Sequence, residues 1–499
     1  MKNIIKLMAV ILALVIIGWF LFTFRITQVP PGINGDEADI GYSAALVSQT
    51  GHDALGRLMP LFTTALKPDD WKQPVSFYSE VLAFYLFGPS FFILRAVSVG
   101  FALAGGVLIF LLVKELLDFK MAVIGFLIYI SIPIIMIQSH LALENIASVP
   151  FVALWLWMLA KYKKDKKIRF LFVAGISMGI SLYSYFGFRL IVPVLSVMTI
   201  YLLWYLSSFK NIKSLKPISI FCLTVAPFVI IMVLVKNQYP GAMFGYGRPS
   251  KIVSYQELAE PFLSSFDPTF LFIRGDITPY HSTGRHGMFL LATLPLFSLG
   301  IFKIIQKKDP FLLFVLMVFF FSPLLYSFVP ALHRASRLLV LIPPFVVIAT
   351  VGFKTLLTIK NKFWKLTLST VIILLLLINY NEFLNDYWYE YPKRVRNNFM
   401  KPIHLAFEKL QQISIKNNLK PLYQSDFVPS DIAAYKFFEK VYFPKGLEYW
   451  SPNSPIPDKS VLIVHESVAK EESNKKLQKI KFDNYDFAVL VNNSQNLNK

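Results

Sequence analysis

The chain has 499 residues, of which 55% are hydrophobic and only 16% are charged, and these proportions exclude an ordinary soluble domain. Fifty Lys and Arg against 30 Asp and Glu give a net charge of +20. Many of these cations lie in short loops between apolar runs, so the charge indicates membrane topology and contact with anionic lipid headgroups, and nucleic acid is not an expected partner. The single cysteine, Cys222, excludes an intramolecular disulfide and a cysteine-based metal site.

Eleven apolar segments are long enough to cross a bilayer, since about 20 apolar residues make one crossing. They lie at 4–24, 92–113, 120–138, 144–160, 169–186, 188–206, 217–235, 287–305, 310–329, 336–353 and 366–380. The first segment has a basic start but no small-residue cleavage site, so we expect it to remain as a membrane span.

Lysine and arginine gather in alternate loops between these segments, at 161–169, 210–216, 303–308 and 354–365. Cytoplasmic loops carry an excess of such cations, which predicts that these loops and the N-terminus are cytoplasmic. The outer face of a cell membrane then carries a long first loop (25–91), a second long loop (236–286) and the tail from 381 onward.

The first outer loop contains two apolar and aromatic stretches, 38–47 and 75–87, that suit helices lying in the membrane interface and roofing a cavity. The tail is rich in charge, with an amphipathic helix at about 400–416 and strand-like runs at 421–423, 460–464 and 487–491. The predicted fold is therefore an all-α polytopic membrane module (1–380) followed by a small extracytoplasmic α/β domain (381–499).

Three carboxylates, Asp36, Glu37 and Asp39, follow the first span directly. The Pro-Pro-Gly and Asn-Gly turns before them break any helix leaving the bilayer, and Asp36 stands where a new helix would begin. An acid at this position can simply cap a surface helix. The alternative is a functional acid, which the other charges expected on the outer face favour.

Charges held against a membrane face are costly and mark a pathway or a site by default. On the outer side they are Lys72, Arg95, His140, Glu144, Arg189, Arg285, His333, Arg334 and Arg337. Acids beside fixed cations suit a reaction in which a carboxylate takes a proton from an acceptor hydroxyl while cations stabilise a departing lipid phosphate. Other roles stay open: Arg95 and Arg189 can reach up to headgroups, and Glu144 can offset a helix dipole.

Metal-ligand spacing is absent, because none of the seven histidines forms a His-x-x-x-His pair. No metal ligand is therefore assigned, and a divalent cation stays open as a cofactor. The sequence also has no phosphate-binding glycine loop and no dinucleotide fingerprint, so direct use of a cytosolic nucleotide is not expected.

The pattern resembles the GT-C superfamily of lipid-phosphate-dependent membrane glycosyltransferases, in particular the protein O-mannosyltransferases and the lipid A aminoarabinose transferases. The resemblance runs through residues 1–355 and is carried by Gly35-Asp-Glu-Ala38, Lys72-Gln-Pro74, Phe87-Gly88 through Arg95, Leu141-Ala-Leu-Glu144 and His333 to Pro343. It implies that Asp36 is the general base, that Lys72 holds the donor phosphate, and that Glu144 is the second acid of the site. The sequence departs from the Lys-Pro-Pro or His-Pro-Pro of relatives at Gln73.

We therefore expect a glycosyltransferase that moves a hexose or pentose from a polyprenyl-phosphate donor to a hydroxyl of a lipid, glycan or protein, with inversion. Expected catalytic residues are Asp36, Glu37 and Glu144; expected phosphate ligands are Lys72, Arg189, Arg334 and Arg337; His140, Arg285 and His333 are candidate substrate contacts. Two alternatives remain, namely a ligase or polymerase acting on lipid-diphosphate glycans and a lipid or sugar transporter.

Overall fold

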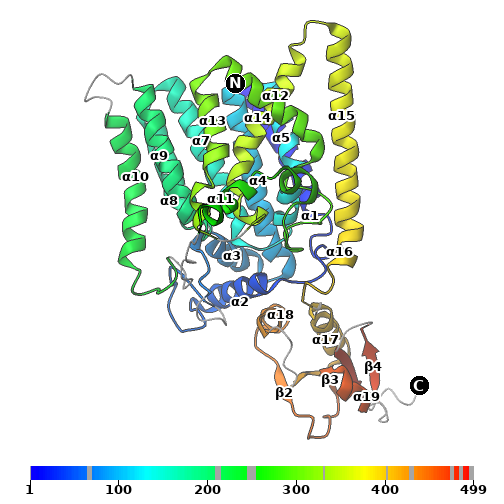
Figure 1. The fold of residues 1–499 in the computed structure, drawn as a ribbon. Helices are drawn as coiled ribbons and strands as arrows, with labels where there is room; N and C mark the ends of the chain where they lie inside the picture. Colours follow the sequence, from blue (N-terminus) through cyan, green and yellow to red (C-terminus); the bar gives the residue numbers. More distant parts are fainter. Residues whose placement is uncertain are drawn as a thin grey trace.

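The computed structural model describes residues 2–64, 70–207, 215–243, 254–329, 332–400, 403–425, 432–471, 477–482 and 487–493. Figure 1 shows an upper bundle of long helices and a small mixed domain below it. The bundle helices are α1 (Lys2–Thr23), α4 (Phe91–Leu116), α5 (Phe119–Ile130), α6 (Pro133–Ser139), α7 (Ser148–Asp165), α8 (Ile168–Ser181), α9 (Phe188–Leu206), α10 (Leu215–Leu234), α12 (Leu294–Lys307), α13 (Pro310–Phe321), α14 (Ile342–Leu357) and α15 (Lys362–Asn385).

Seven of the described helices are long and apolar enough to cross a membrane, or eight if α5 and α6 form one broken span bent by 64°. The protein is thus a multi-pass membrane protein, but the predicted count of eleven spans is higher than this measure supports. The three segments that fall short are α7, whose last turn contains Lys163 and Lys164, and the 14-residue helices α8 and α12. Each nevertheless packs within the bundle, α7 against α4 and α8, and α12 along α14.

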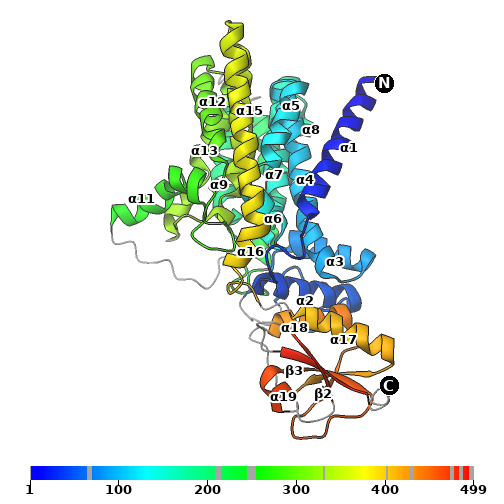
Figure 2. The ribbon, with the colours of Figure 1, turned by 90° about the vertical axis from the view of Figure 1, so that its right-hand side faces the viewer.

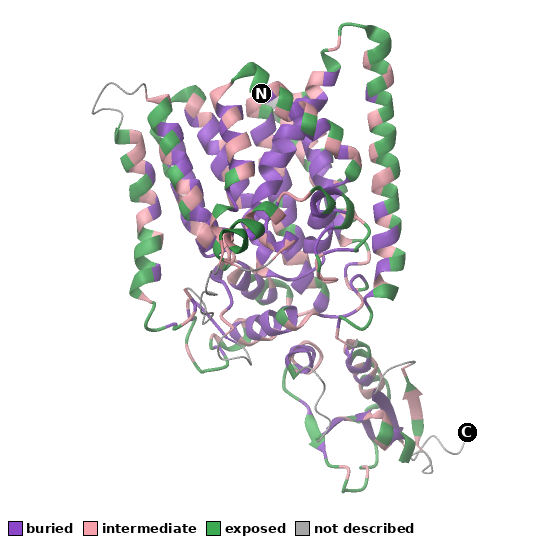
Figure 3. Cartoon of the chain, in the orientation of Figure 1, coloured by how far each residue is buried: buried purple, intermediate pink, exposed green. Residues whose placement is uncertain are grey.

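Helix α14 forms the centre of the bundle, whereas α10 and α15 turn mostly exposed side chains outward (Figure 3). Two glycines allow α12 and α14 to lie against each other. A Cβ atom on Gly300 would come within 2.0 Å of the Ile348 carbonyl oxygen, and one on Gly352 within 1.9 Å of the Leu296 oxygen. Small residues at such crossings permit the close backbone approach that stabilises helix pairs in membranes.

Two helices cross the lower end of the bundle, α2 (Gly35–Thr50) and α3 (Pro74–Phe87), as Figure 2 shows from the side. They confirm the two helical stretches predicted in the first outer loop. The N-cap of α2 is Asn34, two residues before Asp36, and its side chain accepts from the Asp36 backbone N–H at 2.8 Å. Glu37 completes a capping box by accepting from the Asn34 N–H at 2.8 Å.

The C-terminal part contains helices α17 (His404–Asn417), α18 (Ile432–Tyr442) and α19 (Glu466–Glu471) beside a five-stranded sheet. The strands, in spatial order, are β2 (Glu448–Trp450), β1 (Lys420–Gln424), β3 (Ser460–His465), β5 (Phe487–Asn492) and β4 (Gln478–Lys481). β2, β1 and β3 run parallel, and β5 is antiparallel to both β3 and β4.

The C-terminal part packs on α2 and α3 through α18. Phe437 of α18 lies over Gly41 of α2, where a Cβ atom would be only 2.9 Å from the Phe437 ring, and it stacks on Phe84 of α3 at 6.2 Å between ring centroids. A continuous apolar core joins α2 and α3 to α17 and α18. The first outer loop and the tail therefore form one layer at one end of the bundle.

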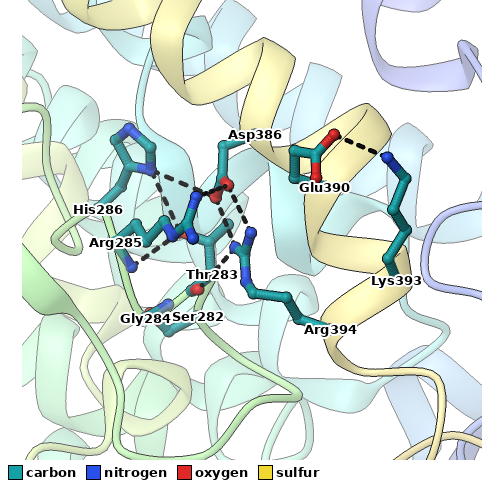
Figure 4. Close-up of polar contacts among 9 residues, drawn as sticks. All are labelled: Ser282, Thr283, Gly284, Arg285, His286, Asp386, Glu390, Lys393 and Arg394. Atoms are coloured by element: carbon teal, nitrogen blue, oxygen red, sulfur yellow. Dashed lines mark hydrogen bonds and ion pairs between the residues drawn. The ribbon is translucent and has the colours of Figure 1, made fainter.

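A polar cluster ties the loop before α12 to the lower end of α15 (Figure 4). Arg394, in the short helix α16 (Tyr391–Arg394), donates to both carboxylate oxygens of the buried Asp386 at 2.7 Å. It also donates to the Thr283 carbonyl oxygen at 3.0 Å, while Arg285 lies 3.4 Å and His286 3.8 Å from the same carboxylate. Arg285 therefore belongs to the cluster that holds this loop against the end of α15.

Candidate active site

A polar cavity of about 330 Å³ lies between α2 and the lower end of the bundle. Segments far apart in the sequence line it, with Asp36, Ile40, Asp70, Lys72, Leu143, Glu144, Asn145, Tyr185, His281, Arg334, Ser336 and Arg337. Five of the residues expected from the sequence therefore meet in one place, namely Asp36, Lys72, Glu144, Arg334 and Arg337.

Asp36 is an exposed acid in the first turn of α2, with its side chain at the cavity wall. The Asn34 cap fixes the backbone of this turn, so the carboxylate is presented from a rigid helix start. Carboxylate oxygens of Asp36, Asp39 and Asp70 lie within 4.8 Å of one another. Oxygen ligands of this kind suit a hard divalent cation.

Lys72 brings a positive charge to this acidic group. Its Nζ lies 2.7 Å from Asp70 Oδ2 and 3.9 Å from Asp39 Oδ2, and its side chain is almost fully buried. Burial lowers the pKa of Lys72, but Asp70, Asp36 and Glu144 outweigh that effect, so the net pKa is raised above the ordinary value. The ammonium therefore stays charged and competes with any divalent cation for the same carboxylates.

Glu144 begins the short 3₁₀ helix η1 (Glu144–Ala147) and accepts a short hydrogen bond from the Gln73 backbone N–H. Desolvation raises the pKa of Glu144 to about 7, against the opposing effect of Lys72. The Gln73 side chain accepts from Arg189 Nη2 at 2.6 Å. Arg189 also donates to the Ala242 and Met243 carbonyl oxygens, so it supports the site from behind and does not line the cavity.

Two arginines enter the cavity from the segment before α14. Arg337 is half-buried and interacts with Tyr185, and Arg334 lies 3.9 Å from Asp276 Oδ1. Asp276 also accepts from the Ala335 backbone N–H at 2.6 Å, which fixes the turn that carries both arginines. Guanidinium groups held in this way suit a phosphate, which they bind through paired N–H donors.

Glu37 is placed behind the cavity wall. It is fully buried and forms a two-pronged ion pair with Arg95, Nε to Oε1 at 3.0 Å and Nη2 to Oε2 at 3.1 Å. Its Oε1 also accepts from the Ala142 backbone N–H at 2.9 Å. These contacts fix the start of α2 against α4 and against the turn that contains Ala142. Glu37 and Arg95 therefore hold the shape of the site.

The three candidate substrate contacts do not line the cavity. His140 is buried with Nδ1 at 2.9 Å from the Val29 carbonyl oxygen, and its ring packs on Tyr387. His333 lies with Nε2 at 3.0 Å from Asp267, and Arg285 belongs to the Asp386 cluster.

Asp70, Asn145, Tyr185 and His281 line the cavity but were not expected from the sequence as site residues. Asp70 stands two positions before Lys72, so its acidity next to a predicted phosphate ligand was a usable signal. His281 reaches the cavity from the second outer loop, with Nδ1 2.8 Å from Gln138 Nε2, and burial lowers its pKa. Nothing in the sequence around His281 indicates that this residue lines the cavity.

A helical membrane bundle with α2 and α3 across one end, and with acids and cations together in one cavity, agrees with the membrane glycosyltransferase expected from the sequence. Residues 67–235 match the family model of dolichyl-phosphate-mannose-protein mannosyltransferase, which confirms the resemblance and the enzyme class, a polyprenyl-phosphate-sugar-dependent glycosyltransferase. The matched segment contains Lys72 and Glu144 of the cavity.

The fold is similar to that of ArnT from Cupriavidus metallidurans. The apo structure of ArnT aligns with a TM-score of 0.55 and 11% identity, covering 98% of both chains. The structure of ArnT bound to undecaprenyl phosphate gives a TM-score of 0.54 and 10% identity, covering 97% of this chain and 98% of that one. At this identity the likeness concerns the fold. Comparison with curated proteins finds no match.

Proposed function

We propose that the protein transfers one sugar from a polyprenyl-phosphate donor to an acceptor hydroxyl at the outer face of the cell membrane, with inversion at the anomeric carbon. The observation that carries the proposal is the cavity that places the exposed Asp36 carboxylate together with Lys72, Arg334 and Arg337. The binding of undecaprenyl phosphate by ArnT, which has the same fold, supports a polyprenyl phosphate as the carrier.

In the proposed step, Asp36 removes the proton of the acceptor hydroxyl as that oxygen forms its bond to the anomeric carbon. The bond between this carbon and the phosphate oxygen breaks, and the electron pair leaves with the phosphate. Lys72, Arg334 and Arg337 stabilise the charge that develops there. A single displacement of this kind inverts the anomeric configuration. This step balances without a divalent cation; if the reaction uses one, Asp36, Asp39 and Asp70 are the residues that would hold it.

Glu144 and Arg189 take supporting roles in this proposal. Glu144 sets the local charge beside Lys72, and Arg189 orders Gln73, whose backbone N–H binds Glu144. The acceptor is a hydroxyl of a lipid, glycan or protein.

The test is replacement of Asp36 by Asn, which keeps the size of the side chain but removes the basic oxygen. A positioned base typically contributes about 10²–10⁴-fold, so D36N should lose turnover on that scale while donor binding changes little. The assay is transfer from a defined polyprenyl-phosphate sugar by the purified protein.

Glu144→Gln is the matched control, because it makes the same chemical change at another acid of the cavity. If D36N keeps near-normal turnover while E144Q abolishes it, the base lies in the second outer turn and the assignment of Asp36 fails.

A further inference from the structure

A second cavity, of about 480 Å³, lies at the end of the bundle opposite the candidate active site. It forms where α4, α7, α12 and α14 end and where α13 begins, which are the helix ends facing upward in Figure 1. The proposed glycosyl transfer uses none of its residues.

The polar lining of this cavity is strongly cationic. Five lysines and two carboxylates face it, namely Lys163, Lys164, Lys303, Lys307, Lys354, Glu115 and Asp309. The two acids are already engaged, Asp309 by Lys163 at 2.8 Å and Glu115 by Lys164 at 2.7 Å. Lys303 and Lys307, one turn apart on α12, have no carboxylate partner among the residues that the structure describes. Positive charge is therefore left over for an anion.

The remaining lining is mostly apolar, with Leu116, Leu117, Ala160, Leu312 and Val351 beside the two hydroxyl residues Thr355 and Thr358. Lysines at helix ends also neutralise helix dipoles and set membrane orientation, which is the simplest explanation of their presence. Neither role needs a hollow in which cations surround an apolar wall. That combination matches an amphiphile whose phosphate meets the lysines while its first carbons contact the leucines.

We propose that this cavity binds the phosphate headgroup of an anionic membrane lipid, with Lys303 and Lys307 as its principal ligands. Juxtamembrane lysines attract anionic lipids, and two of them together should give a preference of about tenfold or more over a neutral lipid. A soluble phosphate shares the anionic chemistry but gains nothing from the apolar wall.

The experiment measures lipid binding to the purified full-length protein by native mass spectrometry. Phosphatidylglycerol and phosphatidylcholine with the same acyl chains are titrated in parallel, and a separate series adds millimolar inorganic phosphate. We expect one phosphatidylglycerol to bind about tenfold more tightly than phosphatidylcholine, with no displacement by phosphate. The variant K303Q/K307Q should lose this preference.

The matched control is K362Q/K365Q, which removes two lysines at the start of α15 that do not line the cavity. It should keep the preference, and both variants should melt at the wild-type temperature without lipid, since none of the four lysines forms an ion pair with a carboxylate in the part of the chain that the structure describes. Equal losses in both variants would overturn the proposal in favour of diffuse surface charge. Displacement of the lipid by inorganic phosphate would overturn it in favour of a soluble anion.

Discussion

Asp36 and Glu144 line the same cavity but have different surroundings. Asp36 is exposed at a helix start, whereas Glu144 is half-buried and bound to the Gln73 N–H. An exposed carboxylate can reach an acceptor that arrives from solution. A desolvated carboxyl with a pKa of about 7 instead changes its charge near neutral pH and so changes the field around Lys72.

We predict that this change of charge makes donor binding dependent on pH. The pKa of Glu144 is raised to about 7, so the group is largely neutral at pH 6 and largely negative at pH 8. A negative Glu144 repels the donor phosphate, and the KM for a phosphodiester donor should rise on the order of three- to tenfold over this range. Steady-state kinetics at several pH values provide the measurement.

The control variant is E144Q, which resembles the neutral form of the side chain at every pH. Its KM should stay near the low-pH value of the wild type, and the pH dependence should flatten. An equally steep rise in E144Q would assign the titration to another group.

At the scale of elements, the turn that leads into α3 organises the site through Gln73. This residue has φ −82°, close to the angle that proline adopts, and its N–H is used by Glu144 while its side chain binds Arg189. The departure from Lys-Pro-Pro thus supplies a donor that proline lacks. The sequence shows Gln73 where relatives have proline. The contacts of Gln73 with Glu144 and Arg189 are evident only from the packing of the structure.

We predict that Gln73→Pro is more damaging than Gln73→Ala. Both variants lose the contact to Arg189, but only proline removes the N–H that binds the Glu144 carboxylate. Because the backbone angle fits proline, the helix start should survive in both. Turnover should fall at least about tenfold further in Q73P than in Q73A, since a desolvated carboxylate loses its donor. Similar turnover in the two variants would show that the N–H bond is unimportant.

Local patterns predicted the elements better than the directions of their side chains. Turn residues and an apolar stripe located α2 and α3, and the apolar runs located β1, β3 and β5, whereas the three-residue β2 and the polar β4 gave too little signal. Glu37 adjoins Asp36 in sequence but is buried against Arg95, whereas Asp36 is exposed. Its orientation depends on α4, which is distant along the chain, so spacing alone could not separate the two acids.

At the scale of the whole molecule, the lysine-rich cavity and the candidate active site lie at opposite ends of the bundle. The C-terminal part joins the active-site end, because α18 packs on α2. This separation of the lysine-rich cavity from the candidate active site suits an enzyme whose basic helix ends face the cytoplasm and whose reaction occurs on the other side of the membrane.

The last prediction concerns this orientation. Lysine alternation predicts that the loop between α7 and α8 is cytoplasmic. The packing of α18 on α2 puts the tail at the same end of the bundle as the first outer loop. Reporters fused at Lys166, in the α7–α8 loop, and at Asn418, at the end of α17, should therefore give signals from opposite sides of the membrane. A reporter at His52, after α2, is the matched control and should agree with Asn418. A cytoplasmic signal at both His52 and Asn418 would invert the assignment and put the reaction on the inner face.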